Sequence, residues 1–285
     1  MTTHAAHTIA EQIHGHFERF TASERKLAQI LLSNYPISGL STVADFSSQA
    51  GVSAPTVLRF VGKLGFSGYP QFQAKLRQEL EERLRSPLSK NQRPDAVHPQ
   101  KRDGLLPQFS EMASANIHDS LEGLSPAEFD RAAALIADTK RPVHILGGRL
   151  SGALAHYLYE HLRTIRPRVH QISGQNSFLT DHLLDMGKRH TLVAFDVRRY
   201  QDDIVRFAQT AHQQGVNVVL VTDQWLSPIA RFAKHIFPLR IETGTTWDSA
   251  AAIVVFIEAL LEATGQKNWQ STRRRIEQLE HLRDG

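Results

Sequence analysis

In the first third of the chain, apolar residues recur every three or four positions, the spacing of one face of an α-helix. The stretch TIAEQIHGHFERF carries Ile9, Ile13 and Phe17 on one stripe, and Pro36 ends the next apolar pattern. Prolines and glycines separate the later segments because neither favours the interior of a helix. The pattern predicts five helices, over residues 8–20, 21–35, 38–51, 54–65 and 69–85.

The period changes in the second half, where short β-branched runs alternate with longer amphipathic segments. Such alternation predicts a parallel sheet with helices on both faces. Strands are predicted over residues 142–148, 168–173, 190–197, 217–223 and 236–241. Helices are predicted over residues 112–124, 125–140, 149–165, 202–215, 225–235 and 249–263.

Between the two patterns lies a proline-rich stretch with few large apolar residues, residues 86–108. We interpret it as a linker; the alternative is a long irregular loop inside one domain. The predicted fold has two domains. An all-α domain covers residues 1–85, and an α/β domain with a parallel sheet flanked by helices covers residues 109–285.

The composition excludes several classes of site but does not identify the function. The 285 residues carry a formal charge of +4 and include no cysteine, which excludes disulfides, thiolate zinc sites and cysteine nucleophiles. The start of the chain lacks an apolar signal core, and the longest apolar run, Ser249 to Ala263, is short and contains Glu258. We expect a soluble cytoplasmic protein with no membrane contact. The 15 histidines are scattered, so no metal site is expected, and no cofactor.

The stretch STVADFSSQAGVSAPTVLRFVGKLG has the pattern of a helix-turn-helix. Ala44 is small where the helices would approach, Gly51 can end the first helix with a positive φ, and Val52 can fill the turn. Ser53 can cap the second helix. The spacing turns one set of residues inward, namely Val57, Phe60, Val61 and Leu64. It turns another set outward, namely Ser53, Thr56, Arg59 and Lys63.

The outward set suits double-stranded DNA. Hydroxyls and cations contact phosphates and base edges, and acids would oppose that contact. No Asp or Glu occurs from Phe46 to Gln78, whereas Arg59, Lys63 and two further cations do. The alternative is a helical bundle with a solvated basic face. Because one short helix offers few contacts, we expect a symmetric homodimer, or a homotetramer, on a palindromic operator.

The segment VSAPTVLRFVGKLGFSGYPQFQAKL resembles the N-terminal signature of the RpiR/MurR family of bacterial transcriptional regulators. The resemblance covers about 65 residues and implies DNA binding. It also implies a C-terminal SIS domain, an α/β unit that binds phosphosugars. The residues from Pro142 to Ala263 resemble such a domain in architecture more than in motif.

In the SIS domains that this segment resembles, the first strand is followed by a glycine loop at a helix N-terminus, where backbone N–H groups can bind an anion. Gly147, Gly148 and Ser151 match that role. The family usually has a second glycine where this chain has Arg149. An arginine at this position can clamp a carboxylate or phosphate, or it can block the pocket.

A second departure follows the strand LVAF. The family places a hydroxyl-rich Ser/Gly/Thr loop there, and this chain has Arg198, Arg199 and Tyr200 instead. Three interpretations stay open: an arginine-lined anion site at the strand end, a lost site whose arginines pair with Asp196, Asp202 or a partner subunit, and ordinary solvated surface.

The other candidates are weaker. Gln175, Asn176 and Ser177 could bind a polar ligand or form a plain loop, and Trp225 could stack on a ligand from an exposed position or pack on a helix. Glu242 is a candidate acid/base residue, and Ser249 is a candidate helix cap.

The sequence therefore predicts a transcriptional regulator of metabolic genes, controlled by a small anionic effector, phosphosugar-like or an organic acid, and not an enzyme. The alternative is a sugar-phosphate isomerase with an accessory helical domain. Effector, operator and sign of regulation stay open.

Overall fold

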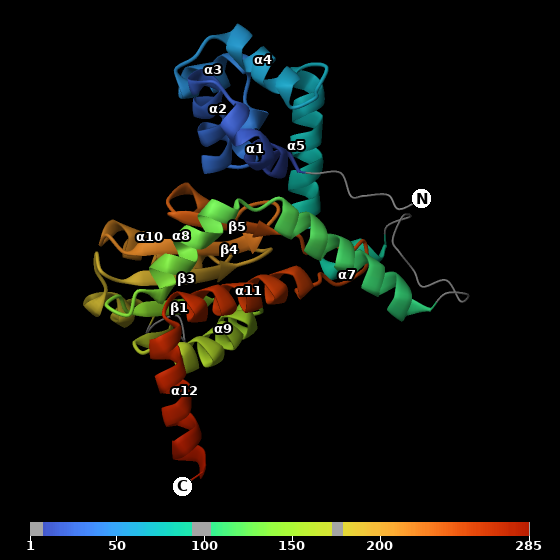
Figure 1. Cartoon of the computed structure of the whole chain (residues 1–285). Coiled ribbons are helices and arrows are strands. Elements are labelled where there is room, and N and C mark those ends of the chain that lie inside the picture. Colours follow the sequence, from blue (N-terminus) through green and yellow to red (C-terminus); the bar gives the residue numbers. More distant parts are fainter. Residues whose placement is uncertain (1–7, 93–103, 173–178, 285) are drawn as a thin grey trace.

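The computed structural model describes residues 8–92, 104–172 and 179–284, in which a helical domain stands on an α/β domain (Figure 1). The five predicted helices of the first domain are all present. They are α1 (Ile9–His16), α2 (Ala22–Ser33), α3 (Val43–Ala50), α4 (Ala54–Lys63) and α5 (Tyr69–Leu84). Short 3-10 turns, Phe17–Arg19 and Ile37–Leu40, follow α1 and α2.

Side-chain caps set where these helices start. Thr8 and Thr21 form capping boxes with glutamates three residues later, at the starts of α1 and α2. The third helix was predicted from residue 38 but begins at Val43, because the Thr42 hydroxyl accepts a hydrogen bond from the Asp45 N–H at 3.1 Å.

The second domain holds a five-stranded parallel sheet in the order β2-β1-β3-β4-β5. Its strands are β1 (Val143–Gly147), β2 (Val169–Ile172), β3 (Thr191–Asp196), β4 (Asn217–Asp223) and β5 (His235–Leu239). Its α-helices are α7 (Leu105–Glu122), α8 (Pro126–Ala137), α9 (Ser151–Ile165), α10 (Asp202–Gln213), α11 (Ala251–Lys267) and α12 (Trp269–Asp284). The predicted parallel sheet is confirmed.

Both faces of the sheet are buried, as the continuous apolar runs of its central strands require. Alternate residues point to opposite faces, so Ile145 packs with α8, α9 and α11 whereas Leu146 packs with α10. On the second face, the 3-10 segment η3 (Leu179–Asp185) adds Leu183. The topology reverses between β1 and β3, so the ends of these two strands flank the crevice where such sheets bind ligands.

The helix predicted over residues 225–235 is wrong. Only one 3-10 turn forms, η4 (Pro228–Arg231). Leu226 has a positive φ of 58°, and the Thr222 hydroxyl accepts a hydrogen bond from the Ser227 N–H at 3.1 Å. These tertiary contacts hold the chain in a turn after β4, and the apolar spacing of the segment reflects burial in that turn.

The two domains share a packed and charged interface. Leu226, from the α/β domain, is buried in the core of the helical domain. The buried Arg240 guanidinium contacts Glu11 at 2.7 Å and Asp119 at 3.2 Å. The Arg83 guanidinium of α5 lies 4.4 Å from the centre of the Tyr200 ring.

The range expected to be a linker is partly helical. The short helix α6 (Pro87–Asn91) follows α5 after a break at Arg85 and Ser86, and Lys90 on it is buried. Helix α7 already begins at Leu105. The domain limits at residues 85 and 109 stay predictions. Among the described helices, none is both long enough and apolar enough to cross a bilayer.

Candidate functional site

Helices α3 and α4 form the helix-turn-helix that the sequence predicts. Gly51 ends α3 in the left-handed conformation, with φ 63° and ψ 40°. The inward set predicted for α4 is buried, which confirms that side of the pattern: Val57, Phe60, Val61 and Leu64. The residue at the helix contact differs from the prediction, because Ala50 is buried whereas Ala44 is exposed.

The outward face of α4 carries the hydroxyls and cations named from the sequence. Ser53, Arg59 and Lys63 are exposed, and Thr56 is half-buried. Ser53 occupies the N-cap position but makes no capping hydrogen bond; its Oγ lies 2.9 Å from Thr56 Oγ1. Arg59 donates to Thr56 Oγ1 at 3.2 Å. Three of the four predicted residues thus form one small polar cluster at the helix start, and Leu58 beside them is exposed.

Lys63 is held differently, by an acid that is distant in sequence. Its Nζ lies 2.7 Å from Glu24 Oε2, and the Glu24 side chain is almost fully covered. Burial opposes ionisation of Glu24, but hydrogen bonds from Lys63 and Thr21 outweigh it and lower the pKa of the carboxyl. The stretch around α4 is free of acids in sequence, yet the fold brings one acid to the end of the helix.

Helices α3 and α4 lie at the end of the helical domain farthest from the sheet (Figure 1). The interface with the α/β domain uses Thr8, Asn34 and Arg83, which lie on or beside α1, α2 and α5. The outward face of α4 is therefore left open to a partner.

A cavity of about 590 Å³ opens where β1 and β3 end. Its walls come from α6, the β1–α9 loop, the β3–α10 loop and the segment before α11. The lining holds five basic side chains and two acidic ones: Arg85, Lys90, Arg149, Arg198, Arg199, Asp196 and Asp248. Leu150, Leu154, Val197 and Trp247 supply an apolar wall. The size and mixed lining suit a small polar metabolite.

Of the glycine-loop candidates, Arg149 and Ser151 line this cavity. Ser151 Oγ already donates to the Phe195 carbonyl at 2.8 Å and accepts from the Gly148 N–H at 2.9 Å. A Cβ on Gly147 would lie 2.7 Å from the Ser151 carbonyl, and one on Gly148 would overlap Gln201. Packing against backbone therefore requires glycine at position 147, whereas at position 148 the Gln201 side chain would have to move.

The three residues predicted from the sequence in the loop between β3 and α10 lie in different surroundings. Arg198 and Arg199 line the cavity, and Arg199 is exposed with a positive φ of 61°. Tyr200 instead donates its hydroxyl to Asp223 at 2.6 Å and packs under Arg83 of the helical domain. Tyr200 therefore belongs to the domain interface.

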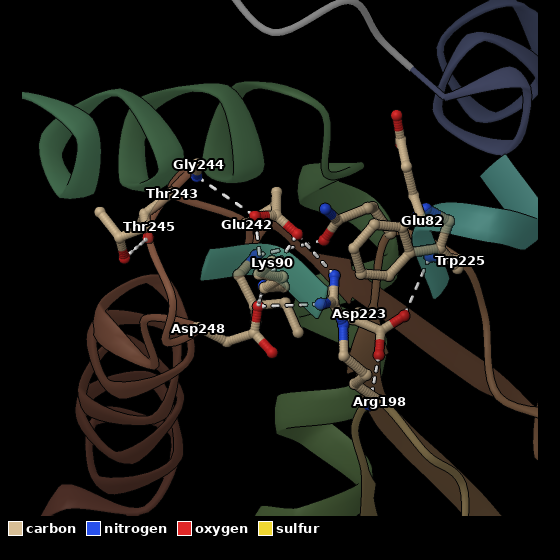
Figure 2. A network of polar contacts seen from close by, with 12 residues as sticks. Glu82, Lys90, Arg198, Asp223, Trp225, Glu242, Thr243, Gly244, Thr245 and Asp248 are labelled. Carbon is tan, nitrogen blue, oxygen red and sulfur yellow. Dashed lines mark hydrogen bonds and ion pairs between the residues drawn. The ribbon is translucent and has the colours of Figure 1, made fainter. Parts of the chain in front are cut away.

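Arg198 is paired, but not with the acids considered from the sequence. Its Nη2 lies 2.7 Å from Glu242 Oε2 and its Nη1 lies 3.3 Å from Asp248 Oδ1. Lys90 contacts the same two carboxylates, at 3.0 and 2.5 Å. Figure 2 shows these four side chains meeting from separate segments of the chain. The guanidinium also lies 4.2 Å from the ring of Trp225.

Of the two alternatives for Trp225, the exposed stacking position is wrong and packing within the protein is right, since the residue is 1% exposed and lies beneath Arg198. Ser249 acts at a helix start, where its Oγ accepts from the Ala251 N–H at 3.3 Å. Gln175, Asn176 and Ser177 lie outside the described residues. Within the described part of the chain, no three His, Asp or Glu side chains are grouped to hold a metal ion.

A buried acidic pair at the ends of β3 and β4 was missed. Burial raises the pKa of Asp196 to about 7, against the hydrogen bond that Ser227 donates to it. Burial likewise raises the pKa of Asp223, which accepts from the Arg198 N–H and from Tyr200. The sequence signal was weak, because each acid simply ends an apolar strand.

Residues 7–83 match the helix-turn-helix domain of the rpiR family, and residues 135–263 match the SIS domain. The transcriptional regulator HexR of Pseudomonas aeruginosa is 26% identical over 283 residues, and the match covers 96% of this chain and 93% of HexR. An uncharacterized transcriptional regulator of Providencia stuartii is 23% identical, covering 87% of this chain and 88% of its own.

Solved structures support the fold. The sugar isomerase domain of an RpiR transcription factor from Sphaerobacter thermophilus superposes with a TM-score of 0.59 at 21% identity, covering 62% of this chain and 98% of that one. Vibrio vulnificus NanR, solved with ManNAc-6P, gives 0.55 at 14% identity and covers 96% of this chain and 97% of NanR. The chain thus combines the helix-turn-helix domain of the rpiR family in its N-terminal part with a SIS domain in its C-terminal half, and the relatives that it matches over most of its length are named transcriptional regulators.

Proposed function

We propose that the chain is a DNA-binding transcriptional regulator whose helix α4 enters the major groove. The observation that carries this proposal is the outward face of α4, where hydroxyls and cations are exposed at the end of the molecule farthest from the sheet. Arg59 and Lys63 contact phosphates or base edges, and Ser53 and Thr56 position the helix start. Two copies bind a palindromic operator, since one helix of this length makes few contacts.

The second part of the proposal is that the cavity beside Arg149 and Arg199 binds a small anionic effector. The excess of basic over acidic lining residues supports it, together with the location at the reversal of strand order. The effector controls DNA binding only if it favours one arrangement of the domains over another. The packed interface at Leu226 and Arg240 provides one such arrangement.

Fluorescence anisotropy with labelled duplex DNA from upstream of the protein's own gene tests the first part. We expect binding at low salt, and at least tenfold weaker binding for Arg59→Ala. Arg274→Ala is the matched control, because this exposed cation lies on α12 at the opposite end of the molecule. If no duplex binds at low salt while aldose–ketose turnover of a sugar phosphate is measured, the isomerase alternative replaces the regulator.

A further inference from the structure

Two buried cations in the cavity wall are neutralised by the protein's own carboxylates. The side chains of Lys90 and Arg198 are 4% and 6% exposed, whereas those of Glu242 and Asp248 are 24% and 29% exposed. Buried charges need partners, and these acids provide them. Burial opposes ionisation of Glu242, but Arg198 and Lys90 outweigh it and hold the pKa of this carboxyl below its usual value.

The cluster leaves hydrogen-bonding capacity unused. A guanidinium has five N–H donors. Arg198 Nε and Nη1 are buried and have no hydrogen-bond acceptor among the described residues, although Nη1 lies 3.3 Å from Asp248. Arg85 Nη1, in the same cavity wall, also has no acceptor there. A bound anion with two acceptor oxygens would accept hydrogen bonds from these donors, which the single contacts of Glu242 and Asp248 leave without an acceptor.

The segment that carries Glu242 and Asp248 also contacts helix α6. Lys90 bonds to both acids, and Thr246 donates to Asn91 Oδ1 at 3.1 Å. Helix α6 starts three residues after α5, the long helix of the DNA-binding domain. Asp248 is thereby linked to α5 through Lys90 and this short connection.

We propose that Lys90 and Arg198 are the anion-binding pair of this cavity, and that Glu242 and Asp248 occupy their binding capacity when no ligand is present. The ligand class is a small dianion, phosphate or dicarboxylate, whose carbon body packs on the apolar wall. Its binding displaces Asp248 and loosens α6 from the SIS domain. This inference rests on the proposed function, since it assigns residues and a control step to the same cavity.

Tryptophan fluorescence reports on the site, because Trp247 lines the cavity and Trp225 lies beneath Arg198. Inorganic phosphate and succinate are titrated separately, at matched ionic strength, into the wild type, Asp248→Asn and the double variant Lys90→Gln/Asp248→Asn. Removing the competing carboxylate should tighten binding of at least one dianion tenfold or more. The double variant should lose that gain, and Glu280→Gln, an exposed position on α12, should match the wild type.

The dianion that binds more tightly to Asp248→Asn than to the wild type shows whether the site recognises phosphate or a dicarboxylate. Equal affinity of Asp248→Asn and the wild type for both dianions would overturn the inference, as would a gain that survives loss of Lys90. Glu242→Gln repeats the test if Asp248→Asn fails to fold by far-UV circular dichroism.

Hydrogen exchange of the Lys90 amide, which bonds to the Ser86 carbonyl at 2.9 Å, tests the coupling to α6. Exchange should be faster in Asp248→Asn with saturating dianion than in the wild type without it, and unchanged exchange would refute the release of α6. DNA binding by the same variants separates the two proposals. Tighter dianion binding without any DNA binding would remove the regulator function alone, whereas DNA binding without that gain would remove this inference alone.

Discussion

Replacing the buried Glu79 by Gln should change how the stability of the helical domain depends on pH. Glu79 on α5 is fully buried and accepts hydrogen bonds from the Ile9 N–H at 3.0 Å and from the Tyr35 hydroxyl. Lys75 Nζ is 3.9 Å away, so its charge compensates only in part. Burial raises the pKa of Glu79 from 4.5 to about 7 despite these partners.

The direction of this pH dependence follows from the linkage between proton binding and folding. Because the folded protein holds the Glu79 proton more tightly than the unfolded chain, its contribution to stability is full below about pH 4.5 and is lost as the pH rises through about 7. Each unit of pKa difference corresponds to about 1.4 kcal/mol. Between pH 5 and pH 8 the wild type should therefore lose about 2–3 kcal/mol of unfolding free energy from this group.

Urea unfolding followed by far-UV circular dichroism at pH 5, 6, 7 and 8 measures this effect. Other groups titrate in the same range, so the informative quantity is the difference in unfolding free energy between the wild type and Glu79→Gln. We expect that difference to move by about 2–3 kcal/mol in favour of the variant as the pH rises. Glu81→Gln, exposed on the same helix, should show no such trend. A difference that stays constant with pH would refute the reasoning.

Three further changes test packing and the domain interface. Leu226→Ala should cost about 2–5 kcal/mol in urea unfolding, because the side chain is buried in the core of the neighbouring domain; a loss below about 0.5 kcal/mol would contradict that burial. Gly147→Ala should lower the thermal midpoint, at a cost of about 1–3 kcal/mol, because its Cβ meets the Ser151 carbonyl; an unchanged midpoint would show that the loop has room. Arg240→Ala removes the buried cation that contacts Glu11 and Asp119 and should speed proteolysis between the domains, with a cost of about 3–5 kcal/mol; a wild-type cleavage rate would argue against the ion pair as an interface contact.

The helix-turn-helix could be predicted because local sequence determines it. Gly51 supplies the left-handed turn, and the spacing of Val57 and Phe60 fixes which face of α4 is buried. The acid beside Lys63 could not be predicted in the same way. Glu24 lies 39 positions earlier in the chain and reaches Lys63 only because α2 packs against α4.

The cavity was only partly predictable for a related reason. Arg149 and Arg198 follow predicted strands, and the ends of parallel strands lie at one edge of the sheet, so the predicted parallel sheet places both residues there. Lys90 falls in a stretch that reads as a linker, and its partners Glu242 and Asp248 come from the far end of the chain. The turn that buries Trp225 was predicted as a helix because it depends on contacts from Asp223 and Thr222, which helical periodicity does not reveal.

The salt dependence of DNA affinity tests the role of α4 most directly. A protein that neutralises phosphates loses affinity as salt rises, and each phosphate contact adds about 0.9 to the slope of log affinity against log salt. We expect a steep negative slope for the wild type on its operator, reduced by about one for each bound subunit in Arg59→Ala. The same slope for Arg59→Ala and the wild type, with equal affinities at low salt, would contradict the assignment of α4 as the DNA-binding helix.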